Sequence, residues 1–318
     1  MAYLLLILGL ALLIIAGEFL VRGAAGLALK AKIPPMIVGL TVVSIGTSAP
    51  ELFASLNAAF AGVPALAIGN VVGSNIANLG LVLAITAIIF PIPIVRDLPR
   101  FDYPVMIIAS LLFFYFVSDL FLDWWEGLIF VVALVLYILA LVRKTRKAKK
   151  AEAIKIAAEE VEEYEEYQGK SYWALLGLIL SGCVGLYFGA DWFVKGASQV
   201  AKSWGVTDHV IGVTLVAFGT SVPELVASCI AAFKKETDIS IGNLVGSNIF
   251  NLLAVMGITA LVKPLQVDPE LLSQDIWWML GISALLLPLM FFGGKIIGKM
   301  KGLIFLAIYI LYILVVLV

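Results

Sequence analysis

The sequence predicts an all-α polytopic membrane protein in which ten transmembrane helices form two inverted five-helix repeats. Two observations predict this fold: bilayer-length apolar stretches recur along the chain, and the two halves of the sequence match one another. Of the 318 residues, 62% are apolar and 14% are charged, whereas a soluble domain carries about 25% charged residues. The stretches are continuous rather than alternating, and lipid offers the backbone no hydrogen-bond partners, so helices are favoured over barrel strands.

Each expected span is an apolar stretch of about 18 residues or more, the length that crosses the hydrocarbon core as a helix. In chain order the spans are 2–21, 33–60, 64–90, 103–118, 124–142, 172–194, 206–233, 239–262, 276–292 and 302–318. Residues 143–170 interrupt the series with a basic run and then an acidic run, and we expect a solvated linker there, with a short surface helix as the alternative. The chain therefore divides into an N-terminal repeat (1–142), this linker and a C-terminal repeat (171–318).

Lysine and arginine residues predict the orientation in the cell membrane, because cytoplasmic loops carry an excess of them. If the 143–170 loop is cytoplasmic, 18 of the 21 basic residues face the cytoplasm, and both termini are extracellular. Five spans in each half then give the halves opposite orientations. Two ion pairs with a spacing of four residues, Glu18–Arg22 and Asp191–Lys195, are expected as structural anchors near span ends.

A constant offset of 173 residues aligns the two halves. Residues 46–51 read GTSAPE and residues 219–224 read GTSVPE; residues 69–79 read GNVVGSNIANL and residues 242–252 read GNLVGSNIFNL. Between residues 36 and 80 the ungapped alignment holds 24 identities in 45 positions. Polar, Gly/Pro-interrupted spans at corresponding positions of two repeats are typical of a transporter whose site lies between the repeats.

The strongest candidates for that site are two glutamates, Glu51 and Glu224, placed deep in the second and seventh spans. A carboxylate inside a membrane costs several kcal/mol unless it is paired or bound to a metal. No lysine or arginine lies at the same depth. A bound cation would remove the repulsion between the two acids; the alternative is a pair of protonated glutamates in a core.

Oxygen-bearing side chains accompany both glutamates. Thr47, Ser48, Thr220 and Ser221 precede them, while Pro50 and Pro223 interrupt the helical hydrogen bonds and expose carbonyls. Ser74, Asn78, Ser247 and Asn251 follow on the next spans. Oxygen ligands suit hard cations such as Ca²⁺. Four further asparagines could either form interhelical hydrogen bonds or line the site: Asn70, Asn75, Asn243 and Asn248.

At these motifs the chain resembles the Na⁺/Ca²⁺ exchanger family of the cation/Ca²⁺ antiporter superfamily, in a minimal prokaryotic or archaeal form. The resemblance implies ten inverted helices, four clustered cation sites, and alternating access in which spans one and six slide past the bundle. It implies metal ligation by twelve residues: Ser44, Thr47, Ser48, Glu51, Ser74, Asn78, Ala217, Thr220, Ser221, Glu224, Ser247 and Asn251. Ser44 and Ala217 would contribute carbonyls. Some relatives have Asp where this chain has Asn251, which argues against K⁺ co-transport.

The leading hypothesis is therefore an antiporter that exchanges Na⁺ for Ca²⁺. The alternatives are a Ca²⁺/H⁺ antiporter and, from another class, a cation channel or a non-transporting membrane scaffold. No motif indicates an enzyme, a catalytic residue or a cofactor, and a net charge of −1 does not indicate nucleic-acid binding. The expected partners are Ca²⁺, Na⁺ and the lipid bilayer, and we expect a monomer.

Overall fold

The computed structural model describes residues 2–94, 98–152, 170–205, 217–292 and 294–317, without the side chains of 145–152, 217–218 and 317. Within these ranges the protein is helical apart from four strands of two residues each. Among the described residues, eight helices are long and apolar enough to cross a membrane, or nine if one bent pair is counted as a span. The all-α membrane fold agrees with the prediction from the sequence.

The spans of the first half are built from the following elements: α1 (Ala2–Ala31); α2 (Pro35–Val38), η1 (Gly39–Val43), α3 (Ser44–Thr47) and α4 (Ala49–Phe60); α5 (Pro64–Ala77), η2 (Asn78–Val82) and α6 (Leu83–Ile89); η3 (Leu98–Asp102), α7 (Tyr103–Phe116) and η4 (Val117–Asp119); and α8 (Trp124–Glu152). Those of the second half are α10 (Tyr172–Ser203); α12 (Ala217–Thr220) and α13 (Val222–Phe233); α14 (Thr237–Phe250), η8 (Asn251–Met256) and α15 (Gly257–Val262); η9 (Leu271–Asp275) and α16 (Ile276–Phe291); and α17 (Lys299–Leu317).

Several predicted boundaries were wrong. The first and sixth spans do not end before Arg22 and Lys195, because α1 continues to Ala31 and α10 to Ser203. The charges at which these spans were predicted to end are paired with acids one helical turn earlier: Arg22 lies 2.5 Å from Glu18, and Lys195 lies 2.7 Å from Asp191. These contacts confirm both expected ion pairs.

Two further expectations fall partly outside the described residues. The helix α8 continues to Glu152, so the start of the expected linker is helical, while 153–169 are not described. The expected span 206–233 is described only from residue 217, as α12 and α13.

Two proline-containing breaks interrupt the helices that carry the glutamates. Ser48 separates α3 from α4 with φ −88° and ψ 2°, and Ser221 separates α12 from α13 with φ −88° and ψ 0°. Pro50 and Pro223 occupy the first turns of α4 and α13, where a missing N–H costs no helical hydrogen bond. The segments Pro35–Thr47 and Ala49–Phe60 are bent by 40° at this break. The same motif therefore produces the same local backbone twice.

Helical turns with i→i+5 hydrogen bonds also recur at the repeat offset. The turn η2 begins at Asn78 and η8 at Asn251; η3 ends at Asp102 and η9 at Asp275. Such π-turns widen a helix locally and occur frequently at functional sites. Both turns that begin with asparagine lie at predicted site residues.

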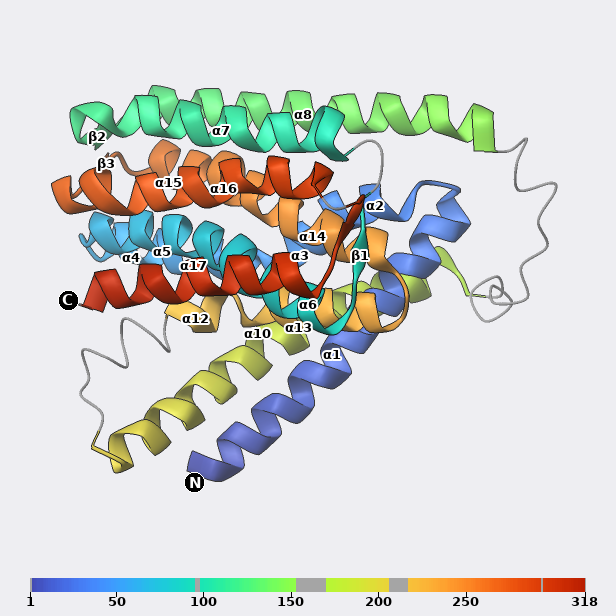
Figure 1. The fold of residues 1–318 in the computed structure, drawn as a ribbon, viewed down its shortest axis with the longest axis horizontal. Helices are drawn as coiled ribbons and strands as arrows, with labels where there is room; N and C mark the ends of the chain where they lie inside the picture. The colour runs from blue at the N-terminus through green and yellow to red at the C-terminus, as the bar shows by residue number, and fades with distance from the viewer. Residues whose placement is uncertain (1, 95–97, 153–169, 206–216, 293, 318) are drawn as a thin grey trace.

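The helices α1 and α10 form a separate antiparallel pair that is inclined to the other helices (Figure 1). Gly182, Gly189 and Gly196, spaced by seven on α10, form the seam. A Cβ added to Gly182 would lie 2.7 Å from the Leu20 backbone nitrogen, and one added to Gly196 would lie 2.6 Å from that of Leu6. The backbones are therefore in direct contact. Close approach of this kind is how helices associate in lipid, where apolar side chains give little preference for one another over lipid tails.

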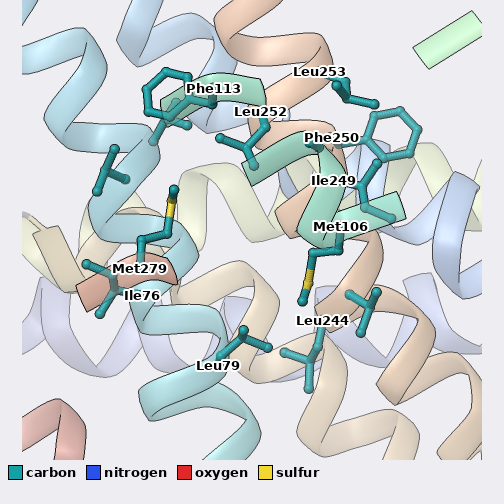
Figure 2. Packing of buried hydrophobic residues seen from close by; sticks show 14 of the residues in the cluster. Ile76, Leu79, Met106, Phe113, Leu244, Ile249, Phe250, Leu252, Leu253 and Met279 are labelled. Carbon is teal, nitrogen blue, oxygen red and sulfur yellow. The ribbon is translucent and has the colours of Figure 1, made fainter. Parts of the chain in front are cut away.

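The remaining helices share a core drawn from corresponding positions of the two halves. Figure 2 shows Ile76, Met106, Ile249 and Met279 in this core; Ile249 and Met279 follow Ile76 and Met106 by the repeat offset, and all four are fully buried. Many large apolar side chains lie on the outside instead, Tyr3, Phe53, Tyr115 and Trp173 among them. An outer surface this apolar is stable against lipid rather than water.

Short strand pairs connect loops of the two halves at opposite ends of the bundle (Figure 1). The strand β1 (Ile92–Pro93) pairs with β4 (Ile296–Ile297), and β2 (Phe121–Leu122) pairs with β3 (Leu265–Gln266), both antiparallel. Each pair joins one loop from each half, so the ends of the helices are held in register by backbone hydrogen bonds.

Candidate cation-binding site

The two predicted glutamates follow the helix breaks and are completely buried. Glu51 lies in the first turn of α4 and Glu224 in the first turn of α13. Among the described residues, three of their four carboxylate oxygens have no hydrogen-bond partner: both of Glu51 and Oε2 of Glu224. The fourth, Glu224 Oε1, accepts a hydrogen bond of 3.3 Å from Ser48 Oγ. A buried acceptor without a donor costs about 1–3 kcal/mol, and more if it is charged, so these oxygens require a positive partner.

Hydroxyl groups from both halves meet in two equivalent pairs beside the carboxylates. Thr47 Oγ1 lies 3.4 Å from Ser247 Oγ, and Ser74 Oγ lies 3.2 Å from Thr220 Oγ1. Each pair joins a residue of the GTSxPE motif in one half to a serine of the GSN motif in the other. The sequence predicted all four residues as candidates, and the structure brings them together across the two halves.

The predicted asparagines lie on the π-turns that pack against the glutamate helices. The turn η8, which begins at Asn251, packs against α4, and η2, which begins at Asn78, packs against α13. Both side chains are completely buried. Within the described residues, neither Asn78 Oδ1 nor Asn251 Oδ1 has a hydrogen-bond partner. These carbonyl oxygens add two neutral acceptors to the same region.

The remaining candidates precede these groups along the broken helices. Ser221 is fully buried and its hydroxyl has no partner among the described residues. The Ser44 carbonyl accepts the ordinary helical hydrogen bond from Ser48 N at 2.9 Å and a longer one of 3.4 Å from Thr47 Oγ1, so a cation would compete with Thr47 for its second lone pair. The backbone of Ala217 begins α12.

The arrangement can hold hard cations. It offers carboxylate, hydroxyl and amide oxygens, the ligand types that Ca²⁺ takes in sixes to eights. In the described part of the chain, no group of three or more His, Cys, Asp or Glu side chains could hold a metal ion. The cluster therefore combines two formal negative charges with neutral oxygens, rather than forming a dense carboxylate site.

For four further asparagines the sequence allows two roles, interhelical hydrogen bonding and lining of the site. Asn70 donates to Ser55 Oγ and Asn243 to Ser228 Oγ, both at 3.1 Å, which is interhelical hydrogen bonding. Asn75 Oδ1 accepts from Asn251 Nδ2 at 3.1 Å. Asn248 is buried, and its side-chain amide has no partner among the described residues.

The sequence reasoning missed two sets of polar residues. Ser55 and Ser228 follow each glutamate by four residues and are identical between the repeats, a signal that the alignment already contained. Asp102 and Asp275 accept from the hydroxyls of Tyr137 and Tyr312 at 3.2 and 3.1 Å. The matching segments LYIL at 136–139 and 311–314 would have revealed that the repeat extends to the last helix of each half.

Comparison with known proteins agrees with this geometry over almost the whole chain. The family model "Sodium/calcium exchanger protein" matches residues 1–143 and 174–318. The chain is 35% identical to the putative antiporter CaxA of Alkalimonas amylolytica, covering 96% of this chain and 95% of that protein. It is 33% identical to the sodium/calcium exchanger MaX1 of Methanosarcina acetivorans, covering 98% and 97%.

A solved structure shows the same similarity in three dimensions. The sodium-calcium exchanger NCX_Mj, soaked with 2.5 mM Na⁺ and 0.1 mM Ca²⁺, superposes with a TM-score of 0.82 at 30% sequence identity. The match covers 98% of this chain and 97% of that one.

Proposed function

The chain belongs to the sodium/calcium exchanger family, and from this premise we propose that it exchanges Na⁺ for Ca²⁺ across the membrane through the cluster around Glu51 and Glu224. One observation carries the proposal: two fully buried carboxylates, with oxygens that lack hydrogen-bond donors, lie beside hydroxyls from both halves of the chain. In a membrane interior, bound cations are the partners that this arrangement lacks.

The proposed ligands are the twelve residues named from the sequence. Glu51 and Glu224 supply the charge, and the hydroxyls of Thr47, Ser48, Thr220, Ser221, Ser74 and Ser247 supply neutral oxygens. The amides of Asn78 and Asn251 and the carbonyls of Ser44 and Ala217 complete the set. Burial and missing donors at Glu51, Glu224, Ser221, Asn78 and Asn251 support this assignment.

Charge balance explains why the two ions would compete. One Ca²⁺ neutralises the two glutamates, and so do two Na⁺. A third Na⁺ leaves the loaded site positive, which makes the cycle electrogenic, with each net charge moved worth about 2.3 kcal/mol per 100 mV. The Na⁺ gradient would then drive Ca²⁺ extrusion. The family match favours Na⁺ over H⁺ as the coupling ion.

The proposed architecture is ten helices in two inverted repeats, with the boundaries given above. The recurrence of the serine breaks, the π-turns and the two strand pairs at corresponding positions supports it. Alternating access would move the inclined pair α1 and α10 past the remaining helices. We further propose that the protein acts as a monomer in the cell membrane, with both termini extracellular and the 143–170 loop cytoplasmic.

Uptake of ⁴⁵Ca²⁺ into proteoliposomes tests the function. Vesicles loaded with Na⁺ and diluted into Na⁺-free buffer should accumulate ⁴⁵Ca²⁺, and vesicles without an outward Na⁺ gradient should not. Glu51→Gln and Glu224→Gln should each abolish uptake, because neutral amides cannot balance a divalent cation. Glu270→Gln is the matched control, since Glu270 is an exposed acid outside the cluster. Uptake that a pH gradient alone drives, or normal flux in both glutamate variants, would overturn the assignment.

A further inference from the structure

A hydroxyl that binds a cation must point its single hydrogen elsewhere. Serine and threonine hydroxyls have one donor and two acceptor lone pairs, and only the lone pairs attract a cation. Thr47 Oγ1 and Ser247 Oγ lie 3.4 Å apart in the cluster. Each therefore needs an acceptor on the side away from the cation.

The side chain of Asn243 supplies that acceptor to both hydroxyls. Its Oδ1 lies 3.1 Å from Thr47 Oγ1 and 3.5 Å from Ser247 Oγ, and the residue is completely buried. A reversed amide would turn its N–H groups toward the two hydroxyls. The Ser247 hydroxyl would then have to accept, and its hydrogen would point into the cluster, while Thr47 would be left with the more distant Ser44 carbonyl, at 3.4 Å, as its acceptor.

Ser228 holds the amide in the productive orientation. Asn243 Nδ2 donates to Ser228 Oγ at 3.1 Å, and Ser228 is also completely buried. Ser228 lies on α13, one turn after Glu224, so the contact also connects α13 to α14.

The first half of the chain has the corresponding contact between Asn70 and Ser55, and there the neighbouring groups show which atom donates and which accepts. Ser55 Oγ donates to the Ala67 carbonyl at 3.3 Å, so its oxygen is left to accept from Asn70 Nδ2 at 3.1 Å. Asn70 Nδ2 also lies 3.3 Å from the Glu51 carbonyl, a group that can only accept. The nitrogen of this amide therefore faces the serine, as it does at Asn243.

We infer that Asn243, anchored by Ser228, is a positioning residue that makes Thr47 and Ser247 present lone pairs to the transported cation. This inference rests on the proposed function. Asn243 and Ser228 act through the hydroxyls, and the pair formed by Asn70 and Ser55 is the counterpart in the other half.

The test is the Ca²⁺ dependence of Na⁺-driven ⁴⁵Ca²⁺ uptake in the variant Ser228→Ala. Loss of a group that orients metal ligands typically costs 10–100-fold in metal affinity. We expect the half-saturating Ca²⁺ concentration to rise about tenfold while the maximal rate stays within about twofold of the unmodified protein. Ser228→Thr keeps the hydroxyl and should restore the lower value.

Two matched variants separate this role from simple packing. Ser240→Ala removes a 3.0 Å hydrogen bond to the Ser228 carbonyl, and the corresponding residue of the first half is already Ala67, so half-saturation should not change. Ser55→Ala leaves Asn70 its second acceptor, the Glu51 carbonyl, so we expect a smaller increase than for Ser228→Ala.

Two results would overturn the inference: unchanged half-saturation in Ser228→Ala, or a loss of maximal rate alone that Ser228→Thr does not restore. Thermal unfolding in detergent identifies any variant that fails to fold, and Ser55→Ala then provides the comparison. If the unmodified protein shows no Na⁺-dependent uptake, the proposed function itself fails, which is a distinct outcome.

Discussion

At the scale of single residues, the two glutamates are placed at a cost to the folded state. Both carboxylates are completely buried, and among the described residues Glu51 has no hydrogen-bond donor for either oxygen. Their charges repel one another. The fold around Ser48 and Ser221 keeps the two carboxylates in place. The free-energy cost of burying them is offset only when a cation binds between them.

Replacing one glutamate should therefore stabilise the cation-free protein. In buffer without Na⁺ or Ca²⁺, we expect Glu51→Gln to increase the free energy of unfolding by about 1–3 kcal/mol, because it removes a buried unpaired charge. Ca²⁺ at 100 times its Kd should stabilise the unmodified protein by about 2.7 kcal/mol and leave the variant unchanged. Thermal unfolding in detergent with and without Ca²⁺ measures both effects. A variant that Ca²⁺ still stabilises would contradict the role of Glu51.

At the scale of elements, the repeat is visible in the turns as well as in the helices. Residues with positive φ occur at corresponding positions: Lys32 (54°) and Gly205 (84°), Gly62 (78°) and Lys235 (63°). Leu120 (66°) and Gly294 (94°) correspond in the same way with one residue of shift. Each turn has glycine in one half only. A side chain with Cβ is strained in this conformation, so the other half carries the strain.

Exchanging the residues at one of these turns should change stability in opposite directions. Lys235→Gly should raise the free energy of unfolding by about 0.5–1 kcal/mol, since Lys235 is exposed and glycine adopts positive φ without steric strain. Gly62→Ala should lower it by about 1–2 kcal/mol, because a Cβ at positive φ is strained even where the surrounding space is open. Urea unfolding of both variants, followed by tryptophan fluorescence, measures the difference. Equal effects of the same sign would contradict the argument.

The close backbone contact between α1 and α10 leads to a second prediction at the scale of elements. Gly182→Leu would place atoms where the Leu20 backbone lies 2.7 Å from a Cβ, so the pair must separate. We expect a loss of more than about 2 kcal/mol of stability through overpacking and of Ca²⁺ uptake. Gly177→Leu on the same helix is the control, because that position is exposed and has open space. Normal uptake in Gly182→Leu would show that the close contact is dispensable.

At the scale of the whole molecule, the two ends of the bundle differ in charge. The loop end held by β2 and β3 carries Asp119, Asp123, Asp268 and Glu270, whereas the end held by β1 and β4 carries Lys295 and Lys299. Because basic loops remain in the cytoplasm, this difference supports the proposal that the end with β1 and β4 faces the inside.

Single cysteines should report this orientation. In a background of Cys183→Ala and Cys229→Ala, we expect a membrane-impermeant maleimide to label Ser118→Cys in intact cells and to label Lys299→Cys only after the membrane is opened. Both positions are exposed, and they adjoin β2 and β4, which belong to the strand pairs at opposite ends of the bundle (Figure 1). The reverse pattern of labelling would place the termini inside.

The sequence by itself determined the membrane class, the repeat and the identity of the buried acids. These follow from local properties: apolar length sets a span, and matched polar letters such as Glu51 and Glu224 stand out against an apolar background. The prolines likewise predicted a local interruption of the helical hydrogen bonds before each glutamate, because a missing N–H acts within one turn of helix; the structure has these breaks at Ser48 and Ser221. Span ends were predicted less well, because the hydrogen bonds of the backbone continue past charges that are paired along the helix, as at Arg22.

Only the tertiary structure decided which oxygens meet. Thr47 faces Ser247 from the other half, and Asn243 orients both through Ser228, although 200 residues separate Thr47 from Ser247. Such contacts depend on how the helices of one half pack against those of the other, and spacing within a helix does not contain that information. The physical reason is that a buried hydroxyl or amide donates or accepts according to all of its neighbours, and those neighbours come from both halves of the chain.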